Sequence, residues 1–325
     1  MADDVGVTLP RPTPARLVTA WQVQPVLIAV IVVLGLGYLV GLRRLRRTGH
    51  RWSAGRCATF ALGLLTLLWA GCGFPARYDS SLYWVWTSRV LLIWLVLPIV
   101  VLSGHPIQLA RAAGSSGTID RLLRGRFARV VANPLVGPAL VPVLSAVLFF
   151  GPVAGWSIAF PAAGWVLDVA LFLVGALMVL PLVGIDDEAS SLAVGLALAV
   201  GCFELVLDAL PGIVLRLHTT LATSWFTYRD VQPWAPAPLR DQQIAGAVLW
   251  CVAEVIDLPF LLLVFRRWLR ADARDAAQVD AVLEAERLAQ RAMRPESERS
   301  DSTAERDAPW WENDPAMQER LRRQA

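Results

Sequence analysis

The amino-acid sequence predicts an all-α protein: a polytopic membrane helix bundle of about seven transmembrane helices, with its N-terminus outside and its C-terminus inside. Hydrophobic residues make up 56% of the 325 residues, and the mean hydropathy is positive. A soluble domain does not need so much apolar surface to fill its core, so a lipid bilayer is the expected solvent. The apolar residues fall into seven windows, and the arginines between those windows are distributed unevenly, which predicts the orientation.

The seven apolar windows each approach or exceed the roughly 20 residues that a helix needs to cross a membrane. They lie at 25–42, 57–75, 82–103, 130–151, 163–184, 191–215 and 242–265. In the first window the positive charges follow the apolar run instead of preceding it, and no small-residue cleavage site ends it. We therefore expect this window to remain as a helix rather than to act as a cleaved signal.

Arginine decides the orientation, because short connections rich in positive charge stay in the cytoplasm. Six arginines crowd the connection after the first window: Arg43, Arg44, Arg46, Arg47, Arg51 and Arg56. Placing that connection inside predicts an extracytoplasmic segment at 1–23, a seven-helix transmembrane domain at 24–265 and a cytoplasmic tail at 266–325. The tail is expected to contain an amphipathic helix near 275–292, a disordered linker near 294–307 and a short terminal element.

Ionisable residues inside the predicted helices are the best candidates for a site, since each costs a few kcal/mol in hydrocarbon and usually faces a partner in the bundle interior. Arg89 in the third window and Asp168 in the fifth both lie roughly 8–10 Å from the outer boundary at about 1.5 Å per residue, which makes them candidate partners. The alternative is that Arg89 snorkels to the outer interface and Asp168 hydrogen-bonds elsewhere. Two further acidic pairs each share one helix face: Glu204 with Asp208, and Glu254 with Asp257. This intramembrane polar network is either a static hydrogen-bonded structure or a path for protons or cations.

The sequence contains no catalytic or metal-binding motif. It has no P-loop, dinucleotide fingerprint, nucleophile elbow or H-E-x-x-H zinc motif, which argues against an enzyme. The three histidines are scattered and the four cysteines form no C-x-x-C pair, so we predict no metal site formed by this chain. No basic patch with interleaved aromatic residues suggests nucleic acid as a partner.

Several short stretches, in a fixed order across about 250 residues, form one pattern. They include Phe74-Pro75-Ala76-Arg77-Tyr78-Asp79 before the third window, Pro98 near its end, Asn133-Pro134-Leu135, and Asp241-Gln242-Gln243-Ile244-Ala245-Gly246 followed by Trp250. Together these stretches resemble the CtaG family of cytochrome c oxidase assembly proteins. The residues of the family motifs are Arg77, Tyr78, Asp79, Pro98, Asp241, Gln242, Gln243, Gly246 and Trp250.

The resemblance implies an assembly factor of the respiratory chain in the bacterial plasma membrane, one that binds partners instead of catalysing a reaction. Besides the lipid bilayer, its expected partners are cytochrome c oxidase subunits or a copper chaperone. Copper is the cofactor that the resemblance suggests, but the expected histidine ligands are replaced by Arg89, by Phe150-Gly151-Pro152, and by Trp165 with Val169. We therefore expect no bound cofactor and an Arg89–Asp168 ion pair in place of a metal-centred contact. The alternative function is a proton- or cation-coupled membrane carrier that uses the intramembrane carboxylates.

Overall fold

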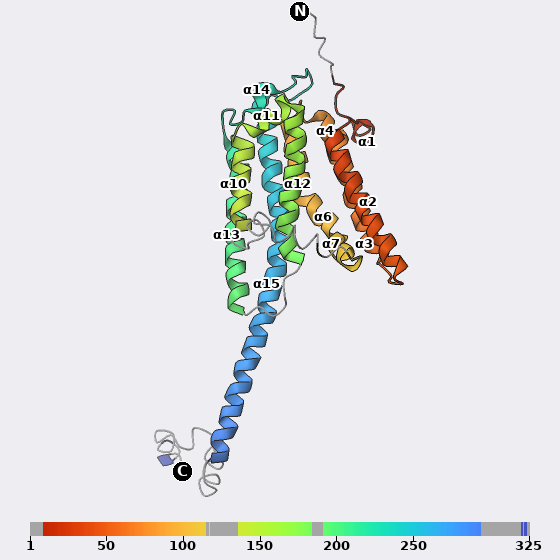
Figure 1. Ribbon diagram of the computed structural model, residues 1–325. Helices are drawn as coiled ribbons and strands as arrows, with labels where there is room; N and C mark the ends of the chain where they lie inside the picture. The colour runs from red at the N-terminus through yellow and green to blue at the C-terminus, as the bar shows by residue number, and fades with distance from the viewer. Residues whose placement is uncertain are drawn as a thin grey trace, which may run out of the picture. The chain divides into compact units, whose positions relative to one another are not determined.

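The computed structural model describes residues 9–114, 117, 136–183, 191–293, 320 and 322–323. The predicted linker near 294–307, the terminal element and the Asn133-Pro134-Leu135 stretch lie outside these residues. Every regular element that the structure describes is helical, which confirms the predicted all-α class (Figure 1). The elements are α1 (Arg16–Thr19), α2 (Pro25–Arg47), α3 (Ala54–Cys72), α4 (Phe74–Tyr78), α5 (Tyr83–Leu91), η1 (Leu92–Val96), α6 (Leu97–Ser103), α7 (Pro106–Ala112), α10 (Val136–Phe150), α11 (Val153–Ala159), α12 (Pro161–Val183), α13 (Ser191–Leu217), α14 (Trp225–Tyr228) and α15 (Pro238–Met293).

Several of these helices are long and apolar enough to cross a membrane, as expected of a multi-pass membrane protein. In the described part of the chain four stretches qualify: Pro25–Arg47, Ala54–Tyr78, Tyr83–Ala112 and Pro161–Val179. A fifth is present if Leu140–Phe150 and Val153–Ala159, which meet at a bend of 55°, count as one span. Helices α13 and α15 cover the sixth and seventh predicted windows. The count of seven spans stays a prediction.

The chain divides into two compact units, and the candidate site lies in the larger one. The larger unit comprises Met1–Glu188 and Gly195–Phe265. The smaller unit comprises Ala189–Val194 and Arg266–Ala325.

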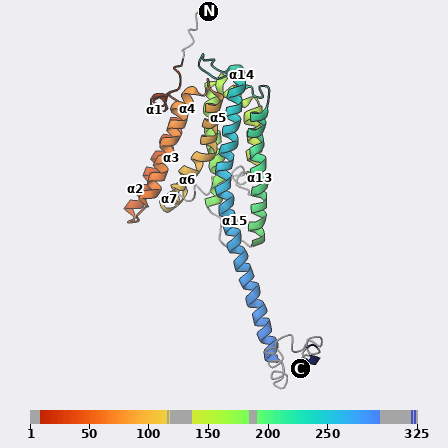
Figure 2. The ribbon, with the colours of Figure 1, turned by 180° about the vertical axis from the view of Figure 1, so that it is seen from behind.

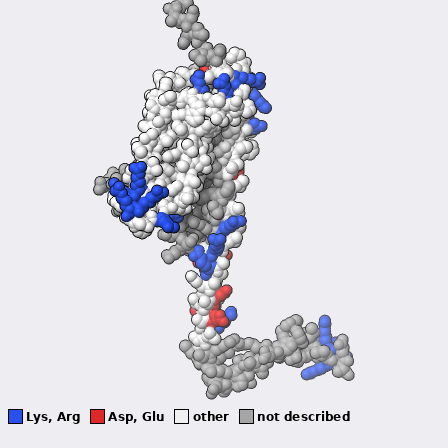
Figure 3. All heavy atoms as spheres, turned by 90° about the vertical axis from the view of Figure 1, so that its right-hand side faces the viewer, with Lys and Arg blue, Asp and Glu red and all other residues white. Residues whose placement is uncertain are grey.

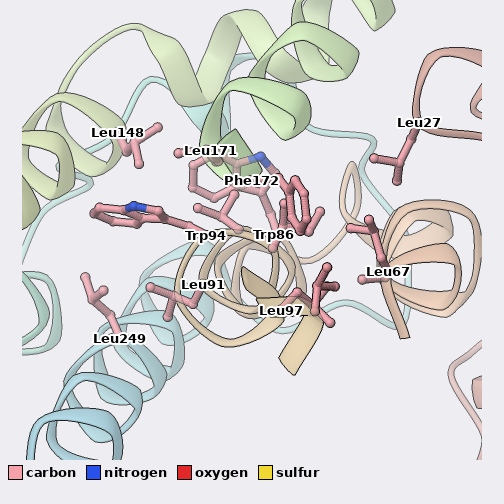
Figure 4. Close-up of a cluster of buried hydrophobic side chains, with 14 of the residues drawn as sticks. Leu27, Leu67, Trp86, Leu91, Trp94, Leu97, Leu148, Leu171, Phe172 and Leu249 are labelled. Carbon is pink, nitrogen blue, oxygen red and sulfur yellow. The ribbon is translucent and has the colours of Figure 1, made fainter. Parts of the chain in front are cut away.

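The core of the larger unit is built around α5, η1 and α6, which follow one another without a break (Figure 2). Large side chains of this central helix project in different directions and are almost completely buried (Figure 4). They meet apolar residues of the surrounding helices, including Leu67 of α3, Leu148 of α10, Phe172 of α12 and Leu249 of α15. Thr87 and Arg89, two polar residues of α5, are buried within this core.

A π-helical turn interrupts the central helix just before Pro98. Proline has no backbone N–H, so Pro98 cannot donate to the carbonyl of Trp94 four residues earlier. The N–H of Leu97 reaches back to the carbonyl of Leu92, which is the five-residue spacing of a π-helix. On α12, a Cβ at Gly175 would collide with the Trp94 carbonyl oxygen, so only glycine lets α12 approach this turn so closely. Pro98 and Gly175 thus set the local shape of the helix that carries Arg89.

The end of the bundle that carries α14 is covered by two segments far apart in the sequence, 9–24 and 218–237 (Figure 1). The backbone N–H of Leu9 donates to Gln232 Oε1 at 3.1 Å, and Trp234 Nε1 donates to the carbonyl of Leu9 at 2.7 Å. The hydroxyl of Tyr78, a motif residue, donates to the carbonyl of Pro10 at 2.9 Å. Trp225 is fully buried, with its ring centroid 5.2 Å from that of Tyr83. This cover shields the helix ends beneath it from water.

Candidate functional site

The guanidinium of Arg89 lies at the centre of the candidate site. Arg89 is on α5, and only 7% of the residue is exposed. Its Nη1 forms an ion pair with Asp79 Oδ2 at 2.5 Å, and its Nη2 forms an ion pair with Asp168 Oδ2. Nη2 also donates to Gln24 Oε1 at 3.3 Å, and Nε donates to the carbonyl of Ala70 at 3.2 Å. The arginine therefore ties α5 to four other segments: the start of α2, α3, the α4–α5 turn and α12.

Gln24 completes a closed set of contacts that we call the Arg89 cluster, formed by Gln24, Asp79, Arg89 and Asp168. Its Nε2 donates to Asp168 Oδ2 at 2.6 Å while its Oε1 accepts from Arg89. Gln24 is 2% exposed and Asp168 is 1% exposed. A Cβ at Gly71 of α3 would lie 3.0 Å from Gln24 Oε1, so the glycine leaves room for this amide. The polar groups of the cluster are turned toward one another, as buried charges require.

The cluster contains one cationic side chain and two carboxylates. This excess of negative charge affects the pKa of Asp79. Asp79 lies in the turn between the candidate spans that end at Tyr78 and begin at Tyr83. Burial is the main cause that raises the pKa of Asp79 from its ordinary 3.8 to about 6, and the negative charge of Asp168 acts in the same direction. The guanidinium of Arg89 opposes both effects. Asp79 is therefore a group of the cluster that takes up a proton near pH 6.

The predicted pairing of Arg89 with Asp168 is present in the structure. The sequence does not predict that Asp79 and Gln24 belong to the cluster. The sequence marks Asp79 only as a motif residue, although it lies ten residues before Arg89. Nothing in the sequence marks Gln24 as a member of the site except its position immediately before the first apolar window. That these residues form a functional site stays a prediction.

The other predicted intramembrane carboxylates lie on α13 and α15. Asp208 of α13 is buried, with 5% of the residue exposed. On α15, Trp250 Nε1 donates to Glu254 Oε1 at 3.2 Å, so these two predicted residues contact each other. The side chains of Glu204 on α13 and Asp257 on α15 lie outside the described part of the chain. A proton or cation path along these four carboxylates stays a prediction.

Asp241, at the start of α15, caps the helix that carries Arg89. It is fully buried, and its carboxylate accepts the backbone N–H of Tyr83 at 2.9 Å and that of Trp84 at 3.0 Å. These are the first two N–H groups of α5, which have no partner within the helix. The Asp241 carboxylate thus acts as the N-cap of α5, although it belongs to α15 and not to the residue that precedes α5.

The neighbouring motif residues fasten the same end of the bundle. Gln242 accepts the N–H of Ala222 at 2.8 Å through Oε1 and donates to the carbonyl of Thr220 at 3.0 Å through Nε2. The carbonyl of Gln243 accepts Arg216 Nη1 at 3.3 Å. A Cβ at Gly246 would lie 2.7 Å from the carbonyl oxygen of Gly212, which brings the backbones of α13 and α15 together. Arg77, at the end of α4, is only half-buried.

The residues present at the Arg89 cluster do not fit copper. Its side-chain donors are carboxylate and amide oxygens rather than the imidazole and sulfur ligands that copper prefers. The positively charged guanidinium also fills the position between the two carboxylates where a cation would bind. In the part of the chain that the structure describes, no group of three or more His, Cys, Asp and Glu residues is arranged to hold a metal ion. The cluster is instead suited to holding helices in fixed positions.

Comparison with known proteins gives one family and several relatives. The sequence model of a family described as cytochrome c oxidase caa3 assembly factor (Caa3_CtaG) matches residues 36–271. Uncharacterised proteins of Mycobacterium bovis and Mycobacterium tuberculosis are each 26% identical to this chain over 292 residues, which cover 85% of this chain and 43% of the relative. An uncharacterised protein of Mycobacterium leprae is 26% identical over 85% of this chain and 44% of its own length. The chain therefore spans less than half the length of these relatives. No solved structure gives a significant match.

Proposed function

The chain belongs to the cytochrome c oxidase caa3 assembly factor (Caa3_CtaG) family, and on that premise we propose that it is a non-enzymatic assembly factor for cytochrome c oxidase in the bacterial plasma membrane. The observation that carries the proposal is the extent of the match, which runs from α2 to α15. The match includes three members of the Arg89 cluster and Asp241, which caps α5. Its proposed partners are oxidase subunits or a copper-delivery protein.

The arrangement of the charged residues supports a binding role. The side chains of the Arg89 cluster are engaged with one another and almost completely buried, so they are not presented to a substrate. Asp241 and Gln242 fix the same end of the bundle from α15. The segments of the α14 end are thus joined by hydrogen bonds, and a surface whose parts are already held together lowers the entropic cost of binding another protein.

The proposed topology has seven spans, with the α14 end outside and the tail inside. It follows from the arginines at the α2–α3 turn, because positively charged connections stay in the cytoplasm. Single cysteines at the exposed positions Thr219 and Asp280, in a chain whose four native cysteines are replaced, provide the test. An impermeant thiol reagent is expected to label the Thr219→Cys variant in intact cells and the Asp280→Cys variant only after lysis. The opposite pattern would invert the topology.

Deletion of the gene is expected to lower the amount of assembled cytochrome c oxidase, and the intact chain supplied in trans should restore it. Added copper separates the two proposed partners, because it should rescue the deletion strain only if the chain acts through copper delivery. The measurements are haem spectra and subunit levels in isolated membranes. Normal oxidase in the deletion strain, together with loss of a proton-driven or cation-driven uptake activity, would contradict the proposal and favour the carrier.

A further inference from the structure

A patch of positive charge lies where α2 turns into α3. We call it the arginine patch; it consists of Arg43, Arg44, Arg46, Arg47, Arg51 and Arg56, all of them exposed. The sequence contains no acidic residue between Asp4 and Asp79, so the connection that carries the patch has no carboxylate of its own. Ion pairs described in the structure involve none of the six. Figure 3 shows basic side chains gathered at this end of α2 and α3.

The turn that carries the patch is held in place by aromatic contacts. Trp52 Nε1 donates to the hydroxyl of Tyr38 at 3.0 Å, and this hydroxyl donates to the carbonyl of Gly104 at 3.0 Å. The ring of Tyr38 is stacked on that of Phe60, with 3.9 Å between the centroids. The guanidinium carbon of Arg56 lies 4.9 Å above the centroid of the Trp52 ring. The turn is thus joined through Trp52 and Tyr38 to Gly104, at the end of α6.

Arg43 and Arg47 end an apolar stripe along α2. They are four residues apart and lie opposite Leu45, which is 5% exposed and faces the bundle. The same face continues with the exposed residues Val32, Val33, Leu36, Leu39 and Val40. Buried residues make up 17% of the most apolar window of α2, against 44% and 50% in the next two spans. From Val32 to Arg43 the helix rises about 16 Å, close to half of the roughly 30 Å hydrocarbon core.

We infer that the arginine patch and the apolar stripe of α2 together bind an anionic phospholipid, with its phosphate on Arg43 and Arg47 and its acyl chains along the stripe. Guanidinium groups form strong charge-assisted hydrogen bonds to phosphate, and arginines next to a membrane span attract anionic lipids. A second copy of the chain does not fit this face, because a parallel pair of α2 helices would bring two arginine patches together. The stripe has the length of one lipid leaflet, which matches an acyl chain.

The test is a titration of the delipidated full chain in neutral detergent, followed by native mass spectrometry. Phosphatidylglycerol is the anionic probe, and phosphatidylcholine with the same acyl chains is the zwitterionic one. The chain should bind phosphatidylglycerol more tightly by at least about tenfold, and R43Q/R47Q should weaken that binding by about thirtyfold. Both arginines are exposed, so the thermal midpoint of the lipid-free variant should equal that of the unmodified chain.

The matched control is R11Q/R16Q, which removes the same charge from two exposed arginines in the N-terminal segment. It should bind phosphatidylglycerol within about twofold of the unmodified chain. Glycerol phosphate, which carries the headgroup without acyl chains, should not compete. The inference is overturned if R43Q/R47Q binds phosphatidylglycerol within twofold of the unmodified chain, or if the two lipids bind with equal affinity. It is also overturned if glycerol phosphate competes as well as the lipid does. Displacement of the lipid by a polyglutamate peptide would assign the patch to an acidic protein partner instead.

Discussion

Arg89→Ala is expected to lower the free energy of unfolding by about 3–5 kcal/mol, the largest effect predicted for any single side chain here. The substitution leaves Asp79 and Asp168 buried without their cation. Each carboxylate must then take up a proton or remain as an unpaired charge in a medium of low dielectric constant. Reversible unfolding of the purified chain in mixed micelles measures this loss.

A double-mutant cycle shows whether the loss comes from stranded charge or from lost packing. Asp168→Leu alone should also be costly, because it removes the partner of Arg89 Nη2 and of Gln24. The double variant R89A/D168L should cost much less than the sum of the two single changes, because only Asp79 then remains to be protonated. Additive effects would contradict the ion-pair interpretation and would assign Arg89 a packing role only.

The pH dependence gives the same cycle an independent readout. Because the pKa of Asp79 is raised to about 6 in the folded chain, the folded state holds a proton that the unfolded state releases near pH 4. Stability from this proton is complete below about pH 4 and is lost as the pH rises through about 6. Without the guanidinium Asp79 holds its proton more strongly, so the cost of Arg89→Ala should be larger at pH 8 than at pH 5.

The parts of the fold that the sequence predicts are those set by local pattern. Runs of apolar residues define the helices because each helix satisfies its own backbone groups in lipid, whatever its neighbours are. Arg89 and Asp168 could be paired because counting residues from the helix ends gives the depth of each one. That count does not apply to Asp79 or Gln24, whose positions depend on how the turn after α4 and the start of α2 fold back over the bundle.

The role of Asp241 could not be predicted for a related reason. Its partners, the N–H groups of Tyr83 and Trp84, are 158 and 157 residues away in the sequence, so no local spacing connects them. A capping side chain is expected immediately before a helix, but the residue in that position of α5 is Leu82, whose side chain cannot accept a hydrogen bond. Pro98 raises a similar difficulty, since the sequence shows the missing N–H but not that Gly175 of α12 faces the freed carbonyl. The resemblance to a family points to Asp241 and Pro98 but not to Gly175, and it does not give the contacts of any of them.

Asp241→Ala is expected to lower the free energy of unfolding by about 2–4 kcal/mol, because it leaves two N–H groups at the start of α5 without an acceptor. Asp241→Asn keeps one acceptor oxygen and should lose roughly half as much. The control is Arg240→Ala at the exposed neighbouring position, which should change stability by less than about 0.5 kcal/mol.

Hydrogen exchange separates a cap from general packing in these variants. If Asp241 acts as the cap of α5, the amides of Tyr83 and Trp84 should exchange faster in the alanine variant, while those of the α3 interior keep their protection. Exchange that rises equally in α3 and α5 would show that Asp241 stabilises the bundle as a whole. Because Arg89 is on the second turn of the capped helix, local fraying of α5 should also weaken the Arg89 cluster. The double variant D241A/R89A would then lose less unfolding free energy than the sum of the losses in the two single variants.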